Sequence, residues 1–511
     1  MSGACRTATR WRRIDARVTP PQAGGAAPAP GGDGLDEALA RVDARAAVVS
    51  LYQKTPKIYA RAVSGWFAGW RWALVWFTQI VFYGLPWLAW NGRQAVLFDL
   101  GARRFYIFGL VLYPQDFIYL TGLLVVCAYA LFLFTTVAGR LWCGYACPQT
   151  VYSEIYMGVE RLFEGDRMQR IKLDAAPWGL NKVWRKSGKQ LVWIAIGLWT
   201  GYTFVGYFSP IRGLAREVVA FGLGPWETFW ILFYGFATYG NAGYMREQVC
   251  KYMCPYARFQ SAMFDKDTLI ISYDGQRGDP RGTRGRKTDL QAARLGHCID
   301  CGLCVQVCPT GIDIRDGLQY ECIGCTACID VCNGVMDKMQ YPRGLIRYAT
   351  LDSIERRLPR GELLRRVWRP RVLVYTAVLV LIVGALGTSL ALRSPFKVDV
   401  VRDRGSLSRI VDDGWIENVY QLQIMNTTER TQHYRIRAAG LDRIATELAG
   451  EVAVEPAQAR WIPVAARVPP EVAQAAGPGA HKIAFEVERV ADAGDPQPRE
   501  QTEPSTFIVP R

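Results

Sequence analysis

Eight of the fourteen cysteines lie between residues 298 and 332, where one spacing occurs twice. The first copy runs Cys298-x-x-Cys301-x-x-Cys304-x-x-x-Cys308-Pro309, and the second repeats it at Cys322, Cys325, Cys328 and Cys332. In proteins that hold two [4Fe–4S] clusters with this spacing, each cluster takes three thiolates from one copy and the fourth from the other. The spacing therefore predicts one cluster on Cys298, Cys301, Cys304 and Cys332, and another on Cys322, Cys325, Cys328 and Cys308.

Other uses of cysteine fit this array less well. A structural zinc ion takes four ligands, usually from two C-x-x-C pairs, and leaves the third cysteine of each copy unexplained. A disulfide framework is typical of small secreted domains, whereas this chain has 511 residues. Asn333 replaces the proline in the second copy, but that proline shapes the backbone and binds no iron. Such clusters normally relay single electrons, and their thiolates require the reducing cytoplasm.

Five runs without a charged residue have about the length that crosses a membrane. They cover residues 72–92, 117–139, 190–211, 228–245 and 372–392, and a spanning helix needs roughly 20 residues. The net charge of +15, the 17 Trp and the 24 Tyr residues suit a protein in a lipid bilayer, because Trp and Tyr settle at the headgroups and Lys and Arg stay inside. No basic helix or recognition motif indicates nucleic-acid binding. The sequence thus predicts an α-helical integral membrane protein with five spans.

The basic residues between these runs predict the orientation. Residues 41–71 hold six Lys or Arg, residues 161–186 hold seven, and the loop at 246–371 is richer still. The segments at 93–116 and 212–227 are shorter and poorer, although Arg103 and Arg104 lie in the first of them. Because basic residues mark cytoplasmic segments, the N-terminus and the cysteine-rich loop are expected inside and the C-terminal part outside. No cysteine follows Cys332, which agrees with this orientation.

The parts between the spans differ in character. Residues 1–50 show no signal peptide and include a low-complexity stretch at 20–34, which predicts a disordered tail; Cys5 has no assigned role there. Residues 51–265 hold four spans, 266–370 form the cytoplasmic loop with the two-cluster module at about 295–340, and 371–393 form the fifth span. The loop opens on TLIISY, a strand signal, and continues through QRGDPRGTRGRK, which predicts a flexible segment.

Residues 394–511 change to the pattern of a β-protein. Tyr420, Leu422 and Ile424 alternate with Gln421 and Gln423, and the same period of two recurs at 434–437 and 482–488. Alternation between turn residues is typical of half-buried strands. It predicts a periplasmic, immunoglobulin-like β-sandwich that lacks an intersheet disulfide and serves in docking or structure.

Two further cysteine pairs follow predicted spans on the cytoplasmic side. Both read C-x-x-x-C-P, at Cys143 with Cys147 after the second span and at Cys250 with Cys254 after the fourth. In a helix, cysteines four residues apart share one face, and the proline is expected to bend or end that helix. Because both spans end at the same depth, the pairs could meet as a four-thiol site.

Such a site has several candidate roles. Thiolates favour Cu(I) and iron, so it could bind copper, cycle as a reversible dithiol or hold a third metal centre. The alternative is that both pairs are inert buried side chains, but their duplication at matching positions favours a function. Met157, Met245 and Met253 are either thioether ligands of copper or core filler. We expect Cys127 to serve packing and His297 to tune the first cluster without binding it.

Long motifs around the cysteines identify a family. They are YQKTPKIYARAVSGWFAGWRW, LWCGYACPQTVYSEIYMGVER, CKYMCPYARFQSAMFDKDTLIISYD, GHCIDCGLCVQVCPTGIDIRDGLQYECIGCTACIDVCNGVMDKM and YPRGLIRYAT. Over roughly residues 50–510, the chain resembles the cytochrome oxidase accessory proteins of the CcoG family, also called FixG or Rdx. The Ala- and Pro-rich N-terminus departs from that family.

The resemblance implies a bacterial inner-membrane protein whose last domain is the sandwich. Members of this family look like cupric reductases, which turn Cu(II) into Cu(I) during assembly of cbb3-type haem–copper oxidase. Oxidase subunits or copper-delivery proteins would then be partners. The eight module cysteines carry over as cluster ligands. Cys143, Cys147, Cys250 and Cys254 match the membrane-edge pairs of the family and are candidate copper or redox thiols.

Three functions remain open from the sequence. The first is a Cu(II) reductase that draws electrons from a quinol or a cytoplasmic reductant. The second is a quinol-linked electron-relay subunit, which usually lacks the sandwich. The third is a non-catalytic assembly scaffold whose clusters sense redox state. The oligomeric state is also open, with a homodimer as one option.

Overall fold

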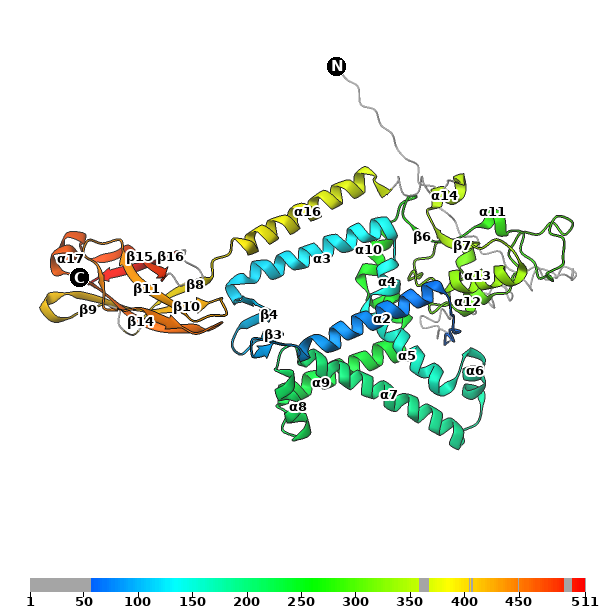
Figure 1. The fold of residues 1–511 in the computed structure, drawn as a ribbon, viewed down its shortest axis with the longest axis horizontal. Coiled ribbons are helices and arrows are strands. Elements are labelled where there is room, and N and C mark those ends of the chain that lie inside the picture. The colour runs from blue at the N-terminus through cyan, green and yellow to red at the C-terminus, as the bar shows by residue number, and fades with distance from the viewer. Residues whose placement is uncertain are drawn as a thin grey trace, which may run out of the picture. The chain divides into compact units, whose positions relative to one another are not determined.

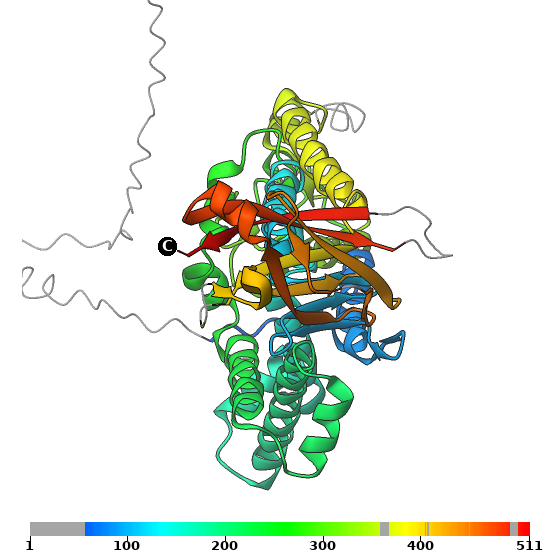
Figure 2. The same ribbon diagram turned by 90° about the vertical axis from the view of Figure 1, so that its left-hand side faces the viewer.

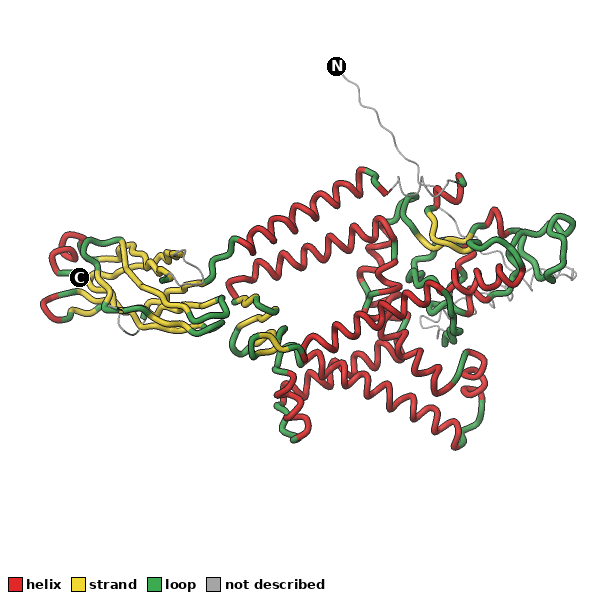
Figure 3. The backbone as a smooth tube through the Cα atoms, in the orientation of Figure 1, coloured by secondary structure: helices red, strands yellow, loops and turns green. Residues whose placement is uncertain are grey.

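The computed structural model describes residues 57–357, 367–403, 405, 408–448, 450–490 and 499–510. The tail predicted at 1–50, including Cys5, lies outside these residues. Within them, helices and strands occupy different stretches of the chain (Figures 1 and 3). Most of the cysteine-rich module is loop, held between short helices and one pair of strands.

The helices lie mainly in the first half of the described chain. They are α2 (Trp66–Gly84), α3 (Phe117–Ala138), α4 (Leu141–Tyr145), α5 (Pro148–Glu164), α6 (Arg167–Ala175), α7 (Leu180–Val205), α8 (Ile211–Val219), α9 (Pro225–Thr238) and α10 (Pro255–Met263). Two π-helical segments, η3 (Tyr239–Met245) and η4 (Val249–Met253), lie between α9 and α10. The later helices are α11 (Gly275–Gly278), α12 (Leu303–Gln306), α13 (Ala327–Met339), α14 (Leu351–Arg356), α16 (Pro370–Ala391) and α17 (Pro470–Ala476).

Each predicted apolar run falls on a helix, but the bounds differ. The first run extends to residue 92, whereas α2 ends at Gly84 and is followed by the 3₁₀ turn Leu85–Trp87. Pro86 in this turn cannot donate a backbone hydrogen bond and so does not continue the helix. The rest of the run forms a turn and a two-residue strand. The fourth run is also divided, because α9 gives way to the π-helical segment η3.

Two of the described helices are long and apolar enough to cross a membrane, at Pro114–Ala138 and Pro370–Ala391. Their side chains are almost entirely exposed, which distinguishes them from the core helix of a soluble protein. α2 and α9 contain many Trp, Tyr and Phe residues, and the first half of α7 is basic. These three helices therefore fall short of the same test, and five spans remain a prediction.

α3 and α16 lie side by side (Figure 1), and polar contacts hold the two helices near both ends of the pair. Asp116, directly before α3, contacts Arg393 and Lys397 after α16, each at 2.5 Å. Near the opposite ends, Arg369 contacts Asp265 at 2.5 Å and also donates to the Thr136 carbonyl at 2.6 Å. Such contacts at both ends oppose sliding of one helix along the other.

Glycines bring α7 and α9 close together. A Cβ atom on Gly201 would lie 2.2 Å from the Ile231 carbonyl oxygen, and one on Gly197 would lie 2.8 Å from the Gly235 oxygen. Gly197 and Gly201 form a small-x-x-x-small pair, which lets membrane helices approach backbone to backbone. The contact between α7 and α9 therefore depends on the absence of side chains.

The C-terminal strands form two packed sheets, as predicted (Figure 2). They are β8 (Phe396–Arg402), β9 (Arg409–Ile410), β10 (Ile416–Asn426), β11 (Gln432–Ala439), β12 (Ala445–Thr446), β13 (Val452–Val454), β14 (Ala459–Val468), β15 (Gly479–Arg489) and β16 (Arg499–Val509). One sheet has the order β12-β14-β10-β8 with β9 beside β10, and the other has the order β13-β11-β15-β16. Tyr420, Leu422 and Ile424 point into the shared core with Phe485, which confirms the predicted alternation.

Smaller sheets lie elsewhere in the chain. β1 (Ala89–Trp90) pairs with β2 (Arg93–Gln94), and β3 (Val96–Asp99), β4 (Arg104–Ile107) and β5 (Leu110–Leu112) form an antiparallel meander. In the module, β6 (Ile270–Tyr273) pairs with β7 (Ile346–Ala349), so the strand signal in TLIISY is confirmed.

The Gly- and Arg-rich segment after β6 is not the flexible linker that its composition predicts. The His297 amide donates to the Arg277 carbonyl at 2.9 Å, and the Gly296 amide donates to the Pro280 carbonyl at 2.8 Å. The segment thus folds back and closes on itself beside Cys298. Composition alone misses this because the hydrogen bonds join residues far apart in the segment.

We predict that Gly201→Val destabilises the protein by about 1–3 kcal/mol, because the added side chain must push α7 away from α9. A lowered thermal midpoint in detergent would measure this. Gly213→Val on α8 is the matched control, because a Cβ there meets open space. Equal midpoints for the two variants would contradict the close packing of α7 and α9.

Candidate metal centres

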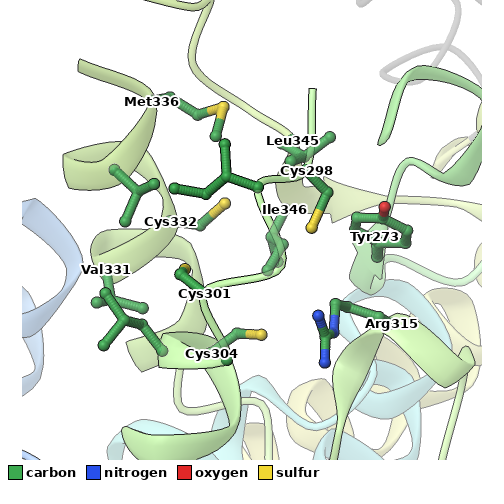
Figure 4. Close-up of a pocket in the computed structure, with 14 residues that line it drawn as sticks. Tyr273, Cys298, Cys301, Cys304, Arg315, Val331, Cys332, Met336, Leu345 and Ile346 are labelled. Carbon is green, nitrogen blue, oxygen red and sulfur yellow. The ribbon is translucent and has the colours of Figure 1, made fainter. Parts of the chain in front are cut away.

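The four cysteines predicted for the first cluster surround one cavity (Figure 4). Cys298 and Cys301 come from the loop before α12, Cys304 from α12 itself, and Cys332 from α13. The cavity encloses about 380 Å³. Burial raises the pKa of Cys332, and so does charge on the nearby Cys304, Cys298 and Cys301 sulfurs.

The remaining wall of this first cavity is largely apolar. It includes Val331, Met336 and Ile346, with Tyr273 and Arg315 as its polar members (Figure 4). The Arg315 guanidinium is held by Asp313 at 2.6 Å and Asp300 at 2.5 Å. These carboxylates fix its position at the edge of the thiol set.

The other four cysteines line a second cavity of about 330 Å³, and Cys304 lines both cavities. The second set comprises Cys308, Cys322, Cys325 and Cys328. The crossing predicted from the sequence is therefore present in the geometry, since each cavity takes its fourth cysteine from the other copy. Ligand roles for these eight residues remain predictions.

The arrangement of the eight module cysteines suits [4Fe–4S] clusters. A [4Fe–4S] cluster places one thiolate on each of four separate irons, so its ligands surround a space. Both cavities have this character, with sulfurs around an interior that is otherwise mostly apolar.

Burial raises the pKa of several module thiols. It raises the pKa of Cys322 to about 11 and that of Cys325 to about 12. In the metal-free protein these thiols stay protonated at neutral pH, and metal binding must displace the protons.

The second cavity lies against the membrane-edge helix α4. A Cβ atom on Gly144 of α4 would lie 2.6 Å from the Gly324 carbonyl oxygen and 2.9 Å from the Cys325 amide nitrogen. Gly324 itself has φ +71 and approaches the Arg140 carbonyl. The backbone of the first C-x-x-x-C-P motif therefore touches the loop that carries Cys325.

Two buried arginines secure this contact. Arg71 of α2 donates to the Cys325 carbonyl at 3.2 Å and pairs with Glu154 of α5 at 3.2 Å. Arg140 donates to the Cys322 carbonyl at 3.3 Å and to the Ala257 carbonyl of α10 at 2.6 Å. Positive charge this close to the second cysteine loop would favour the reduced, more negative state of a bound cluster.

A carboxylate of the module also caps α2. Asp330 of α13 accepts hydrogen bonds from the amides of Phe67 at 3.3 Å and Ala68 at 2.7 Å. These amides have no partner within their own helix, and a negative charge suits a helix N-terminus. The start of α2 is thus attached to the cluster module.

The two C-x-x-x-C-P motifs adopt matching conformations. Cys143 lies in α4 and Cys250 in η4, whereas Cys147 and Cys254 are the extended residues directly before α5 and α10. Each proline begins the following helix, where its missing N–H costs nothing. The two cysteines of a pair therefore do not share one helix, but the helix that carries the first cysteine does end just before the Cys-Pro, as predicted.

The structure brings the four membrane-edge thiols together. The pKa of Cys250 is raised to about 12 by burial and by the Cys147, Cys143 and Cys254 sulfurs nearby. Burial likewise raises the pKa of Cys143 to about 11. Gln260 of α10 donates to the Cys143 sulfur at 3.3 Å, which links one motif to the other.

Cys250 and Cys325 both line a third cavity of about 460 Å³. Its wall includes Arg71, Glu154, Arg246 and Glu247, together with the thioether of Met157. A metal ion entering here would meet carboxylate oxygens and soft sulfur between the two thiol sites.

The remaining sequence candidates fall into different surroundings. Met245 and Met253 are exposed and line none of these cavities. Cys127 is exposed on α3, and its packing role stays a prediction. His297 accepts a hydrogen bond from Arg277 at 2.7 Å and stacks on Tyr341. Burial and the arginine lower the His297 pKa, so it stays neutral beside the first site.

Four residues of the quoted motifs make contacts that the motifs themselves do not reveal. Arg71, Gly144, Gln260 and Gly324 hold the thiol sites together, yet none is a metal ligand. In the sequence, only Arg71 indicated such a contact, because it is a charged residue at the edge of an apolar run.

Comparisons with known proteins agree with this division of the chain. Residues 245–351 match the family described as "4Fe-4S dicluster domain", and residues 386–510 match the "IG-like fold at C-terminal of FixG". Residues 120–164, which include Cys143 and Cys147, match a "4Fe-4S binding domain".

Full-length relatives are also similar. The nitrogen fixation protein FixG of Rhizobium meliloti is 37% identical over 78% of this chain and 82% of its own length. Protein RdxB of Cereibacter sphaeroides is 40% identical over 79% of this chain and 86% of its own. A solved FixG-related protein from Vibrio parahaemolyticus is 25% identical over 23% of this chain and 97% of its own, with a TM-score of 0.19.

We predict that Gly144→Ala removes iron from the second site, because the methyl group would displace the Gly324–Cys325 backbone. Bound iron should fall by about half, since one of two clusters is lost. Iron analysis and electron paramagnetic resonance measure this. Gly334→Ala on α13, where a Cβ meets open space, is the control, and full iron in both variants would refute the contact.

We further predict that the metal-free protein loses stability as pH rises. Cysteines of the unfolded chain have a pKa of about 8.5, whereas burial raises the pKa of Cys322 to about 11 and that of Cys325 to about 12. The folded state then binds more protons than the unfolded state, so its stability falls above pH 8.5. Thiolate absorbance of the native metal-free protein should lag that of the unfolded chain, and coincident titrations would contradict the burial.

Proposed function

Because the chain belongs to the FixG/Rdx family of 4Fe–4S electron-transfer proteins, we propose that it reduces Cu(II) to Cu(I) for the assembly of a cbb3-type haem–copper oxidase. The observation that carries this proposal is the four-thiol set beside the second cysteine loop, where Gly144 touches Cys325. Oxidase subunits or copper-delivery proteins would receive the product.

The chemistry needs one electron for each copper ion. A quinol or a cytoplasmic reductant supplies this electron, which reduces bound Cu(II) to Cu(I). One-electron transfer is what the two [4Fe–4S] clusters contribute when the eight module cysteines hold them. Binding of copper falls to the other thiols of this chain.

The residues around the third cavity suit both oxidation states of copper. Glu154 and Glu247 offer oxygen ligands at its wall, and Met157 and Cys250 offer sulfur. Soft thiolate and thioether ligands favour Cu(I) over Cu(II). Copper bound by Cys143, Cys147, Cys250 and Cys254 would therefore be easier to reduce and would be retained after reduction.

The proposal includes five membrane spans, with the N-terminus and the module inside and the sandwich outside. Large apolar side chains are exposed not only on α3 and α16 but also on the other three helices, for example Trp76 on α2, Leu191 on α7 and Phe236 on α9. Exposed apolar faces of this size suit lipid contact. The basic residues before α2 and around α6 support the orientation.

A third iron–sulfur centre is the second candidate for the four thiols. The match of residues 120–164 to a 4Fe-4S binding domain favours it. The chain would then resemble a quinol-linked relay more than a copper reductase. The scaffold function has no contact in its favour beyond the sandwich itself.

We predict that Cys143→Ser with Cys250→Ser lowers copper affinity, and Cu(II) reduction by protein that is first reduced with dithionite and then freed of it, by roughly 10-fold or more, the scale seen when metal-site groups are removed. A Cu(I)-specific chelator and anaerobic dialysis measure the two effects. Cys127→Ser, an exposed thiol on α3, is the control. Unchanged copper reduction with intact module iron would overturn the proposal, and a loss of iron instead of copper would favour the third iron–sulfur centre.

A further inference from the structure

Basic side chains gather on the loop at residues 279–296, beside the first cysteine cavity. We call this set the basic rim, and its members are Arg281, Arg284, Arg286, Lys287 and Arg294. Only Asp279 and Asp289 oppose them within the loop. A protein surface with such an excess of one charge attracts partners of the opposite charge.

Most of the rim charge is not neutralised inside the chain. Arg281 pairs with Asp279 at 3.2 Å, and Asp289 accepts a hydrogen bond from the Gln291 amide. Arg286, Lys287 and Arg294 are exposed, and no ion pair to any of them occurs within the described part of the chain. Their charge is therefore available to a partner.

The rim is tied to a predicted cluster ligand. The Gly282 amide and the Arg284 guanidinium both donate to the Cys298 carbonyl, at 3.4 and 3.3 Å. The Cys298 amide donates in turn to the Gly278 carbonyl at 3.2 Å, and Arg284 also lies 5.5 Å over the Tyr341 ring. The charged loop thus has a set position at the first site.

The two cysteine sites differ in access. Each set contains one buried cysteine, Cys304 or Cys325, but only the first set contains an exposed one, Cys301. Figure 4 shows Cys298 and Cys301 on the wall of the first cavity. An external electron donor can therefore approach the first site more closely than the second, whose Cys325 lies against α4.

We propose that the basic rim docks an acidic one-electron carrier protein of the ferredoxin or flavodoxin class. The reduced carrier gives up one electron at the first site and leaves in its oxidised form. Complementary charge speeds such encounters and orients them, while a small contact area keeps them transient. This inference rests on the electron-transfer part of the proposed function and is independent of copper as the acceptor.

The test is binding of an acidic ferredoxin to the purified protein, measured by surface plasmon resonance across a range of salt concentrations. Binding should weaken with salt. The variant Arg286→Glu, Lys287→Glu, Arg294→Glu should lose roughly 10-fold or more in association rate. The matched control, Arg430→Glu, Arg460→Glu, Lys482→Glu, changes three exposed basic residues of the sandwich and should bind as the wild type does.

Iron content equal to that of the wild type verifies that the rim variant is folded. If the variant does not fold, the salt dependence of ferredoxin binding to the wild type tests the proposal instead. Salt-independent binding, no binding, or equal loss in rim and control variants would overturn the proposal. A rim variant that no longer binds anionic lipid vesicles but still binds ferredoxin would also overturn the proposal. Copper reduction by protein that was reduced with dithionite does not involve the carrier. If that copper reduction fails, the result counts against the copper proposal alone.

Discussion

The close approach of α4 to the second cysteine loop is the constraint on which the rest of the site depends. Gly144 and Gly324 meet with no room for a side chain on either. Arg71 and Arg140 then donate hydrogen bonds to the Cys325 and Cys322 carbonyl groups of that loop. Because of this contact, the membrane-edge thiols and the second cavity form one connected region.

The two four-cysteine sites are chemically unequal because of their surroundings. The first borders exposed loop residues and carries the basic rim. The second is covered by α2, α4 and the start of α5, with the Arg71–Glu154 pair at its edge. The buried Arg71 would raise the reduction potential of a cluster at the second site. Solvent exposure and hydrogen bonds would instead set the reduction potential of a cluster at the first site. In the proposed function, this inequality would give electron transfer a solvent-facing site and a second site beside the four thiols.

Much of the local architecture was predictable from the sequence. The period of two in 420–424 gave the correct inward side chains because sheet geometry fixes alternation. The repeated cysteine spacing led to the crossed grouping of eight cysteines around two cavities. Predictions failed for two reasons. Local proline effects were missed where Pro86 shortened α2 and where Pro148 and Pro255 began new helices. Contacts between distant residues were missed where backbone hydrogen bonds closed the loop at 279–296.

The sequence by itself determined the chemistry of the donor atoms, the two-sheet C-terminal domain and the family. Only the tertiary structure decided that Cys143, Cys147, Cys250 and Cys254 meet, that Gly144 lies on Cys325, and that Arg71 reaches a carbonyl more than 250 residues away. The physical reason is that residue type and spacing fix local geometry and ligand preference. Whether separate segments lie close together depends instead on how whole helices pack, and here that packing depends on Gly144 and Gly324.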